Sequence, residues 1–453
     1  MKGRTRPALS GILLLLLPGV ASCYQPRPLD ARAIMNEVAE ESQARGEGKK
    51  PRASVTATGT AAAQGLTEDQ AVALALRANP DLRAARRQRG IAEGEIVAAG
   101  ALANPTVGFD VLHLQDNRTG TAQAITLGWD PPQPWIYAAG RASARAGADA
   151  VAAEIAEAEW QLAISVRGAH AGLLAVAEER VLVGKGLEVR RKITELVTRR
   201  VSGGASTRLD LSLAQLAVSQ AETLRDDLAA QQIAAAQALG QLLGTEASPP
   251  RAVGALSDQT TAPPPLEVLV ESALASRPAV TAEEQRFLQK EQNLRLEHAR
   301  RWPWFRFTAI PRYRNDSTDA HPSDYAVGVQ LTLPILNQNG GGVQIAEGLR
   351  DQERESFRKL VSGIRRELGS ARDEIVLRNE TVQRYQTAVL PGLDAHERLL
   401  GIALSGGQVD VVALLTAQDA ILRNRRDYVG MRLGAYRARL KLERAIGPRE
   451  RAK

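Results

Sequence analysis

The chain has 453 residues, of which 44% are hydrophobic and only 4% aromatic, and its formal net charge is +7. The 58 basic residues are nearly balanced by 51 acidic ones, and no basic stretch is interleaved with aromatic side chains, so nucleic acid binding is not indicated. Ala, Leu, Arg, Gln and Glu dominate instead, which is typical of long helices packed through small side chains.

The N-terminus has the pattern of a bacterial lipoprotein signal peptide at residues 1–22. Basic residues precede the apolar run 12–17, which is too short to span a bilayer, and Val20-Ala21-Ser22 supplies the small residues that a signal peptidase needs. Cys23, the single cysteine of the chain, follows at once. We expect Cys23 to be the lipidated mature N-terminus, held in the membrane by acyl chains such as palmitate. The alternative is an ordinary signal peptide that leaves a free cysteine.

The rest of the chain contains an internal duplication. Pro80 aligns with Pro278 near the start of each copy, and Gly244 aligns with Gly447 near the end. No run approaches 18 apolar residues, so we expect no transmembrane helix after the signal. The predicted parts are a lipid-anchored spacer at 23–64, a first repeat at 65–247, a Pro-rich linker at 248–265 and a second repeat at 266–448.

Each repeat is predicted to begin with two helices. The short helices at about 66–78 and 266–276 end before a proline, because the residue that precedes proline disfavours the α region. A second helix of about 20 residues then extends to Pro105 in the first repeat and to Pro303 in the second.

Two strands are expected next in each repeat. The segments "WFRFTAIPRYR" (304–314) and "YAVGVQLTL" (325–333) alternate well between apolar and polar residues, and 106–114 and 123–129 alternate more weakly. Such alternation indicates a half-buried sheet in a soluble domain. After a signal peptide, it equally indicates a strand with one face in lipid and one in water.

Two groups of residues on these strands have a functional and a structural interpretation. Arg306, Arg312 and Arg314 share one face of their strand, where they either line a lumen and favour anions or form an ordinary solvated face. Four tryptophans at or beside the strand ends either form an interfacial belt or pack between sheet and helix: Trp129, Trp135, Trp302 and Trp304.

Long helices are predicted at about 137–202 and 340–404. Each ends at a Gly-Gly pair, and each is followed by a returning helix of about 40 residues with small residues at coiled-coil spacing. We expect bends or breaks in the long helices at Gly168, Gly184, Gly363 and Pro391.

The number of strands limits the architecture. Four strands of about ten residues are long enough to cross an outer membrane when tilted, but they cannot close, and an open sheet edge is not tolerated in lipid. Several copies must therefore share one barrel. A barrel of eight strands is filled by its own side chains, so a conduit favours at least three copies.

The chain resembles the TolC-like outer-membrane efflux proteins over nearly all of its mature length. The resemblance is carried by the "A-L-x-x-N-P-x-L" opening at 75–82, the duplicated order of elements, and the Gly-Gly pairs followed by "L-x-A-Q". "LTLPILNQNGGGVQIAE" (331–347) and "VLPGLDAH" (389–396) are most similar to the heavy-metal branch of that family.

The resemblance implies a mainly α-helical chain with a small β part and no cofactor. Three copies would form a channel-tunnel with four transmembrane strands per protomer, twelve in all, and a coiled-coil α-helical barrel reaching into the periplasm. The implied partners of this homotrimer are outer-membrane lipid, a periplasmic adaptor protein and an inner-membrane transporter of the RND type.

The resemblance also assigns site residues. Asp210 matches an aperture-lining aspartate of some relatives, although an N-terminal helix cap is an equally good interpretation of both Asp210 and Asp410. The implied adaptor-docking tips contain Gly203, Gly204, Ser206, Gly406, Gly407 and Asp410.

An enzyme or a metal protein is not indicated. The sequence has no P-loop, nucleophile elbow or paired-carboxylate motif, and its five histidines have no metal-ligand spacing: His113, His170, His298, His321 and His396. The sequence therefore predicts a passive outer-membrane exit duct for heavy-metal cations or drugs. The alternatives are the outer-membrane channel of an ATP-driven type I protein secretion system and a lipid-anchored periplasmic coiled-coil adaptor or scaffold.

Overall fold

The computed structural model describes residues 65–116, 118–245, 250–256, 260–315, 322–406 and 410–448. These belong to one structural unit, Gln64–Lys453. The predicted signal peptide, the spacer with Cys23, and Gly407 lie outside the described residues.

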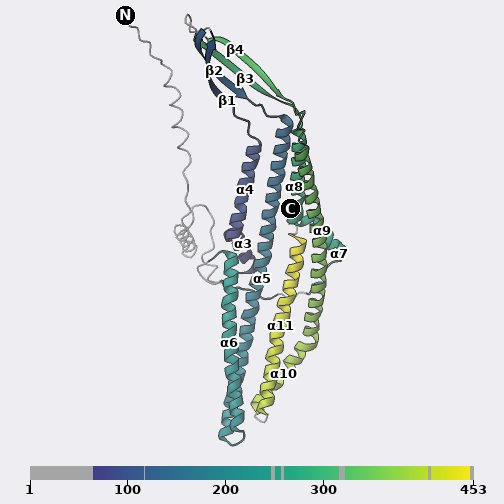
Figure 1. Ribbon diagram of the computed structural model, residues 1–453. Coiled ribbons are helices and arrows are strands. Elements are labelled where there is room, and N and C mark those ends of the chain that lie inside the picture. The colour runs from purple at the N-terminus through teal and green to yellow at the C-terminus, as the bar shows by residue number, and fades with distance from the viewer. Residues whose placement is uncertain are drawn as a thin grey trace, which may run out of the picture. The chain divides into compact units, whose positions relative to one another are not determined.

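The two halves of this unit have the same order of elements (Figure 1), which confirms a mainly helical chain with a small sheet. The first half contains α3 (Glu68–Ala78), α4 (Pro80–Ala99), β1 (Thr106–Asp116), β2 (Arg118–Trp129), α5 (Pro134–Ser202) and α6 (Arg208–Leu243). The second half contains α7 (Leu266–Ser276), α8 (Pro278–Ala299), β3 (Trp304–Asn315), β4 (Pro322–Thr332), α9 (Gly340–Arg384), the π-helical turn η1 (Tyr385–Val389), α10 (Leu390–Gly406) and α11 (Val411–Ile446).

The prolines that end α3 and α7 also begin the next helices. Pro80 and Pro278 occupy the first turns of α4 and α8, where a missing backbone N–H costs nothing. Asn79 caps the start of α4 and links it to α6. Its side chain accepts a hydrogen bond from the Leu82 N–H at 2.9 Å and donates one to the Leu242 carbonyl of α6 at 3.0 Å. The predicted ends of α3 and α7 are therefore confirmed, whereas α4 ends at Ala99 and α8 at Ala299, before the Pro105 and Pro303 that we expected them to reach.

The aligned glycines at the ends of α6 and α11 have equivalent contacts. Gly244 has a φ of 64°, and a Cβ there would lie 2.6 Å from the carbonyl oxygen of Ala78. Gly447 has a φ of 98°, and its Cβ would lie 2.8 Å from the Cα of Arg277. Each returning helix thus ends with its backbone against the turn between the first two helices of its own repeat.

We expected bends or breaks at the internal glycines, and breaks do not occur in α5 and α9, while bends there stay a prediction. Helix α5 runs without interruption for 69 residues through Gly168 and Gly184, and α9 continues through Gly363. Packing outweighs the weak helix propensity of glycine here, as at Gly168, which leaves room for Leu440 of α11. The irregularity predicted at Pro391 is present as the π turn η1, which ends two residues before it.

Ion pairs between α5 and α11 tie the two halves together. Arg167 pairs with Glu443, Glu178 with Arg432 at 2.8 Å, Glu179 with Arg426 at 3.1 Å, and Arg190 with Asp419. The residue numbers rise along α5 as they fall along α11, so these are successive rungs between two antiparallel helices (Figure 1).

The first rung extends to a third helix. The Arg167 guanidinium also contacts Glu68 of α3 at 2.5 Å, and the Tyr436 hydroxyl donates to Glu68 at 2.6 Å. Burial, together with the hydrogen bond to Glu68, raises the pKa of Tyr436 well above its ordinary value. The tyrosine therefore stays a neutral donor within this cluster.

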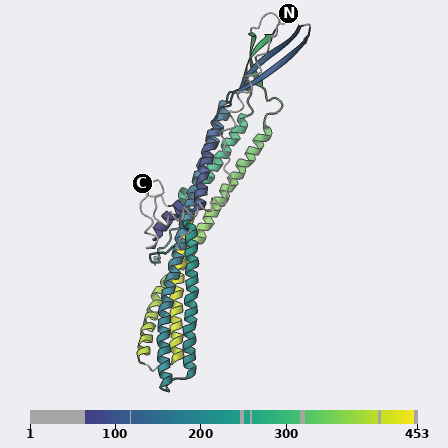
Figure 2. The same cartoon turned by 90° about the vertical axis from the view of Figure 1, so that its left-hand side faces the viewer.

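The four strands form one antiparallel sheet in the order β1-β2-β3-β4. The two halves meet in its middle, where Leu127 of β2 lies opposite Ala309 of β3. Among the described residues, β1 and β4 pair on one side only. The strands lie at one end of the long helices, and the C-terminal ends of α5 and α10 lie at the other (Figures 1 and 2). No described helix combines the length and apolar character needed to cross a bilayer.

Gly244→Ala tests the duplicated helix ends. We expect it to destabilise the protein by about 2 kcal/mol. A left-handed backbone conformation is unfavourable for alanine, and its methyl group would overlap the carbonyl oxygen of Ala78. Thermal unfolding followed by circular dichroism measures the loss. Gly348→Ala is the matched control, since Gly348 is helical with nothing within 4 Å of a Cβ, and it should be neutral or slightly stabilising. Equal stability of both variants contradicts the assignment.

Candidate functional site: the strand faces and the helical turns

One face of the sheet is apolar and uncovered. Directly paired residues lie on the same face, so the register places Val107, Leu127, Ala309 and Val327 in one row across the four strands. On β4, the side chains of Tyr325, Val327 and Val329 are 87%, 75% and 62% exposed. The other exposed apolar residues of this face are Phe109, Val111, Trp129, Phe305, Phe307 and Leu331.

The opposite face carries small and polar residues. One row across all four strands reads Thr106, Gly128, Thr308 and Gly328. The Thr106 hydroxyl donates to the Gly128 carbonyl at 3.2 Å, and the Thr308 hydroxyl donates to the Gly328 carbonyl at 3.3 Å. The sheet therefore has the two-faced character of a wall between an apolar phase and water.

The predicted luminal arginine Arg306 lies on this polar face, opposite Gln330. Its guanidinium binds both carboxylate oxygens of Asp130, at 2.7 and 2.8 Å. Asp130 follows directly after β2, so the pair joins the two halves and its charges cancel. Arg312 and Arg314 also lie in β3. For these two residues the structure describes only the backbone.

The tryptophans gather at the helix-proximal end of the sheet. The rings of Trp135 and Trp304 meet edge to face at 5.9 Å, and Trp304 contacts Phe305 at 5.1 Å. The indole N–H of Trp129 donates to the Ala103 carbonyl at 3.2 Å, and Trp302 is exposed. This arrangement fits both the interfacial belt and the packing interpretation, because the rings contact one another and remain partly exposed.

The turn after α5 has a compact hydrogen-bonded form. The Gly204 N–H donates to the Val201 carbonyl, and the Ala205 N–H donates to the Arg200 carbonyl. These are the two bonds of a Schellman motif, with Gly204 at the left-handed position, where φ is 71°. Gly203 keeps a φ of −88°, so only the second glycine of this pair is required by the backbone.

Helix α6 begins at once with a reciprocal cap. The Thr207 N–H donates to the Asp210 carboxylate at 2.8 Å, and the Asp210 N–H donates to the Thr207 hydroxyl at 3.2 Å. Hydrogen bonds from Thr207 hold the pKa of Asp210 below its ordinary value. The N-cap of α6 is therefore Thr207 and not Asp210, which completes the capping box from the third position of the helix; a role of Asp210 at an aperture stays a prediction.

The second turn has a matching cap. Helix α10 ends at Gly406, and Asp410 begins α11 by accepting a hydrogen bond from the Val412 N–H at 3.2 Å. Behind the two turns, one apolar cluster joins all four helices: Ile193, Val197, Ala214, Leu393, Leu400, Val411, Leu414 and Ile421. The turns are thus held together by packing that extends back along the helices.

No group of three or more metal-ligating side chains occurs in the described part of the chain. His170 is buried, and its Nε2 contacts the Leu66 carbonyl at 2.9 Å, which is the contact of a packed core histidine. His396 contacts the Gly392 carbonyl of its own helix at 2.8 Å.

Comparisons with known proteins agree with this geometry. No family model matches the chain. The chain is 26% identical over 398 residues to the cobalt-zinc-cadmium resistance protein CzcC of Cupriavidus metallidurans, a match that covers 85% of this chain and 91% of the relative.

Solved structures of outer-membrane channels have the same fold. CusC matches with a TM-score of 0.71 and 16% identity, covering 88% of this chain and 96% of that chain. VceC of Vibrio cholerae matches at 0.67 with 20% identity, over 84% and 96%. The open state of MtrE of Neisseria gonorrhoeae matches at 0.69 with 16% identity, over 84% and 88%. The chain therefore has the fold of the TolC-like outer-membrane channel proteins, and the resemblance seen in its motifs is confirmed.

The sequence analysis did not identify two residue pairs that are present in the structure, Thr207–Asp210 and Arg306–Asp130. The Thr207–Asp210 cap has a readable signal, since a Ser or Thr three residues before an acid at a helix start is a known pattern. The Arg306–Asp130 pair has none, because its members are far apart in the chain and become neighbours only when β2 pairs with β3.

Val329→Lys tests the apolar face of the sheet. If this face contacts lipid, a lysine near the bilayer centre costs about 2–4 kcal/mol per subunit, and the outer-membrane fraction of the protein should fall sharply. Gln330→Lys is the matched control, one residue along β4 on the polar face, and should insert normally. Fractionation followed by quantitative immunoblotting measures both. Equal insertion of the two variants rules out a lipid-facing role.

Proposed function

We propose that the chain is one subunit of an outer-membrane efflux channel, a passive exit duct in which three copies complete one barrel. The observation that carries this proposal is the sheet, which has one bare apolar face and two open edges within the described residues. Backbone groups along those edges need partners in lipid, and the edge strands of identical copies supply them. Three copies give twelve strands, which leave an open lumen.

The proposed partner at the far end is a periplasmic adaptor that engages the two helical turns. Leu209 lies two residues after the N-cap Thr207, and Val412 lies two residues after the N-cap Asp410. Ile402 lies near the end of α10. These side chains are 68%, 49% and 66% exposed, although the helices behind them are well packed. Exposed apolar residues around tight turns favour docking of another helical protein.

A lipid anchor at Cys23 completes the proposed placement. The signal pattern before it supports export, and its acyl chains would hold the N-terminus in the same membrane as the barrel. Mass spectrometry of the mature protein tests this part alone, because a different N-terminus or an unmodified cysteine refutes the anchor and leaves the channel proposal standing.

The proposed cargo is a small solute delivered by an inner-membrane transporter of the RND type. The similarity to a cobalt-zinc-cadmium resistance protein favours heavy-metal cations over drugs. A channel for type I protein secretion remains the second candidate, since the fold serves either cargo. A periplasmic adaptor is disfavoured, because it gives no account of the uncovered apolar face of the sheet.

Purified protein in planar bilayers tests the channel directly. We expect discrete conductance steps and an oligomer whose gel mobility changes on heating. Cys23→Ala, expressed with a signal peptide that leaves no lipid, should still form this oligomer in the outer membrane, because the barrel rather than the lipid anchors it. A Cys23→Ala protein that is entirely soluble and monomeric refutes the proposal.

Gly204→Val tests the docking turn. Valine disfavours a φ of 71°, so the turn should distort, while a Cβ at Gly204 meets nothing within 4 Å and the helices behind it stay packed. We expect crosslinking to the adaptor to fall at least about tenfold, the effect of losing about 1.4 kcal/mol of binding, with trimer yield unchanged. Ser206→Ala is the control within the same turn. Parallel loss of trimer and adaptor crosslinks contradicts a docking role.

A further inference from the structure

The connection between β4 and α9 exposes apolar side chains just beyond the sheet. Leu333, Ile335 and Leu336 are all exposed, Leu336 completely. The Ile335 N–H donates to the Leu333 carbonyl at 2.9 Å, so the chain makes a tight turn here. Leu333 follows Val329 and Leu331 at alternate positions, which continues the apolar face of the sheet to its helix-proximal end.

The end of α8 and the exposed Trp302 lie beside this connection. Trp304 pairs with Thr332 at the first position of the β3–β4 ladder, and Trp302 comes two residues before it. The Asn339 side chain donates to the Glu297 carbonyl of α8 at 2.9 Å and to the Glu297 carboxylate at 2.8 Å, which ties the connection to α8. The resulting surface, called the junction patch below, consists of Trp302, Leu333, Ile335 and Leu336.

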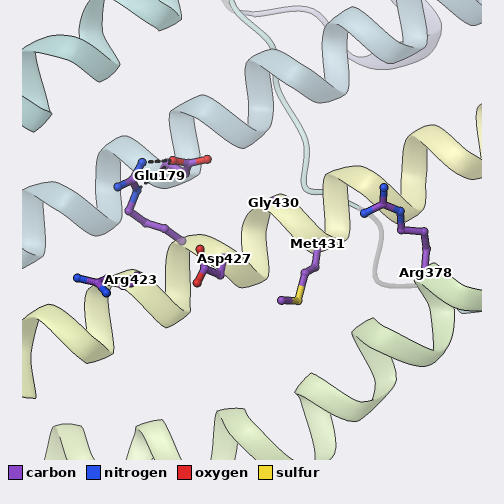
Figure 3. A pocket seen from close by; sticks show the side chains of 7 residues that line it. Glu179, Arg378, Arg423, Asp427, Gly430 and Met431 are labelled. Carbon is purple, nitrogen blue, oxygen red and sulfur yellow. Dashed lines mark hydrogen bonds and ion pairs between the residues drawn. The ribbon is translucent and has the colours of Figure 1, made fainter.

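One arginine beside the junction patch has no carboxylate partner in the part of the chain that the structure describes. Arg300 pairs with Glu297 at 2.7 Å, whereas the exposed guanidinium of Arg301 makes no ion pair with a described residue. Arginines packed between the long helices differ, as in the pocket between α5, α9 and α11, where Arg426 pairs with Glu179 at 3.1 Å (Figure 3). Within the described residues, the junction patch therefore has one uncompensated positive charge beside its apolar side chains.

Only the second repeat has this basic group. With Pro303 aligned to Pro105, the segment 300–302 reads Arg-Arg-Trp. The matching segment 102–104 reads Leu-Ala-Asn and carries no charge. Residues 96–109, which lead into the edge strand β1, contain no acidic side chain. In the proposed barrel this stretch of the next copy lies beside β4, so it supplies no carboxylate for Arg301. The charge beside the patch therefore favours an anionic partner other than the next copy.

We propose that the junction patch binds anionic phospholipid of the periplasm-facing leaflet of the outer membrane. The inference rests on the proposed channel function, which puts the helix-proximal end of the sheet at the membrane surface. Trp302, Ile335 and Leu336 enter the interfacial region, where aromatic rings of membrane barrels gather. Arg301 binds the lipid phosphate, because its planar guanidinium donates paired N–H groups to phosphate oxygens. Three copies of the chain present three such surfaces.

Quenching of Trp302 fluorescence by brominated lipid tests the lipid preference. The purified protein is reconstituted in phosphatidylcholine vesicles that contain a minor fraction of brominated phosphatidylglycerol or brominated phosphatidylcholine. The Trp302 signal is the difference between each protein and the same protein with Trp302→Phe. We expect phosphatidylglycerol to be favoured about fivefold, the effect of one arginine at an anionic surface, and Arg301→Gln to abolish this preference. Arg358→Gln, at an exposed arginine farther along α9, is the matched control and should keep it. Equal quenching by both lipids in the wild-type protein, or the same loss in both variants, overturns the proposal.

Ile335→Ser with Leu336→Ser tests whether lipid or another copy covers the junction patch. We expect quenching of Trp302 to fall at least about twofold with trimer yield and helix content unchanged, because these side chains contact lipid alone. Val268→Ser with Leu274→Ser, at exposed apolar residues of α7, is the control and should leave quenching unchanged. Loss of the trimer in the first variant assigns the patch to contacts between copies and refutes lipid binding. A wild-type protein that conducts in planar bilayers but shows no lipid preference refutes this inference alone, whereas one that neither inserts nor conducts refutes the proposed channel.

Discussion

The backbone hydrogen bonds at the two edges of the sheet are the constraint on which the rest of the structure depends. Strands β1 and β4 each pair on one side only within the described residues, although one face of the sheet is apolar enough for hydrocarbon. In water, such edges are capped by solvent, but in lipid they must be paired by another strand. In the proposed outer-membrane location, the sheet therefore needs the edge strands of further copies as partners.

The two repeats are joined to each other both in the sheet and in the helical part of the structure. In the sheet, the join is the β2–β3 pairing together with the Arg306–Asp130 ion pair. In the helical part, it is the ladder of ion pairs between α5 and α11. Each of these contacts links residues far apart in the chain. Within the described residues, the two repeats thus form one continuous unit, with open sheet edges at β1 and β4.

Local patterns predicted the elements well and long-range contacts poorly. The prolines at 80 and 278 define helix boundaries because the chemistry of proline acts on the adjacent residue. The strand register follows from alternation, since a slip of one residue would reverse the two faces. The glycines of α5 do not break the helix, because packing against α11 supports it at Gly168. The Asp130 partner of Arg306 has no local signature, because it depends on which strand lies alongside.

Arginines are paired with carboxylates both in the sheet and in the helical part of the protomer. In the sheet, the described arginine on the polar face is neutralised by a bidentate carboxylate, and its neighbours in the Thr106–Gly128 row are uncharged. In the helical part, Arg426 pairs with Glu179 at 3.1 Å and Arg378 contacts Glu374 at 3.9 Å. Fixed charge attracts counter-ions most strongly where the walls are close and the medium is poorly polarisable. In the proposed channel, the described polar face of the sheet therefore keeps one net fixed charge, the Asp110 carboxylate, which accepts a hydrogen bond from the Thr126 hydroxyl at 3.2 Å.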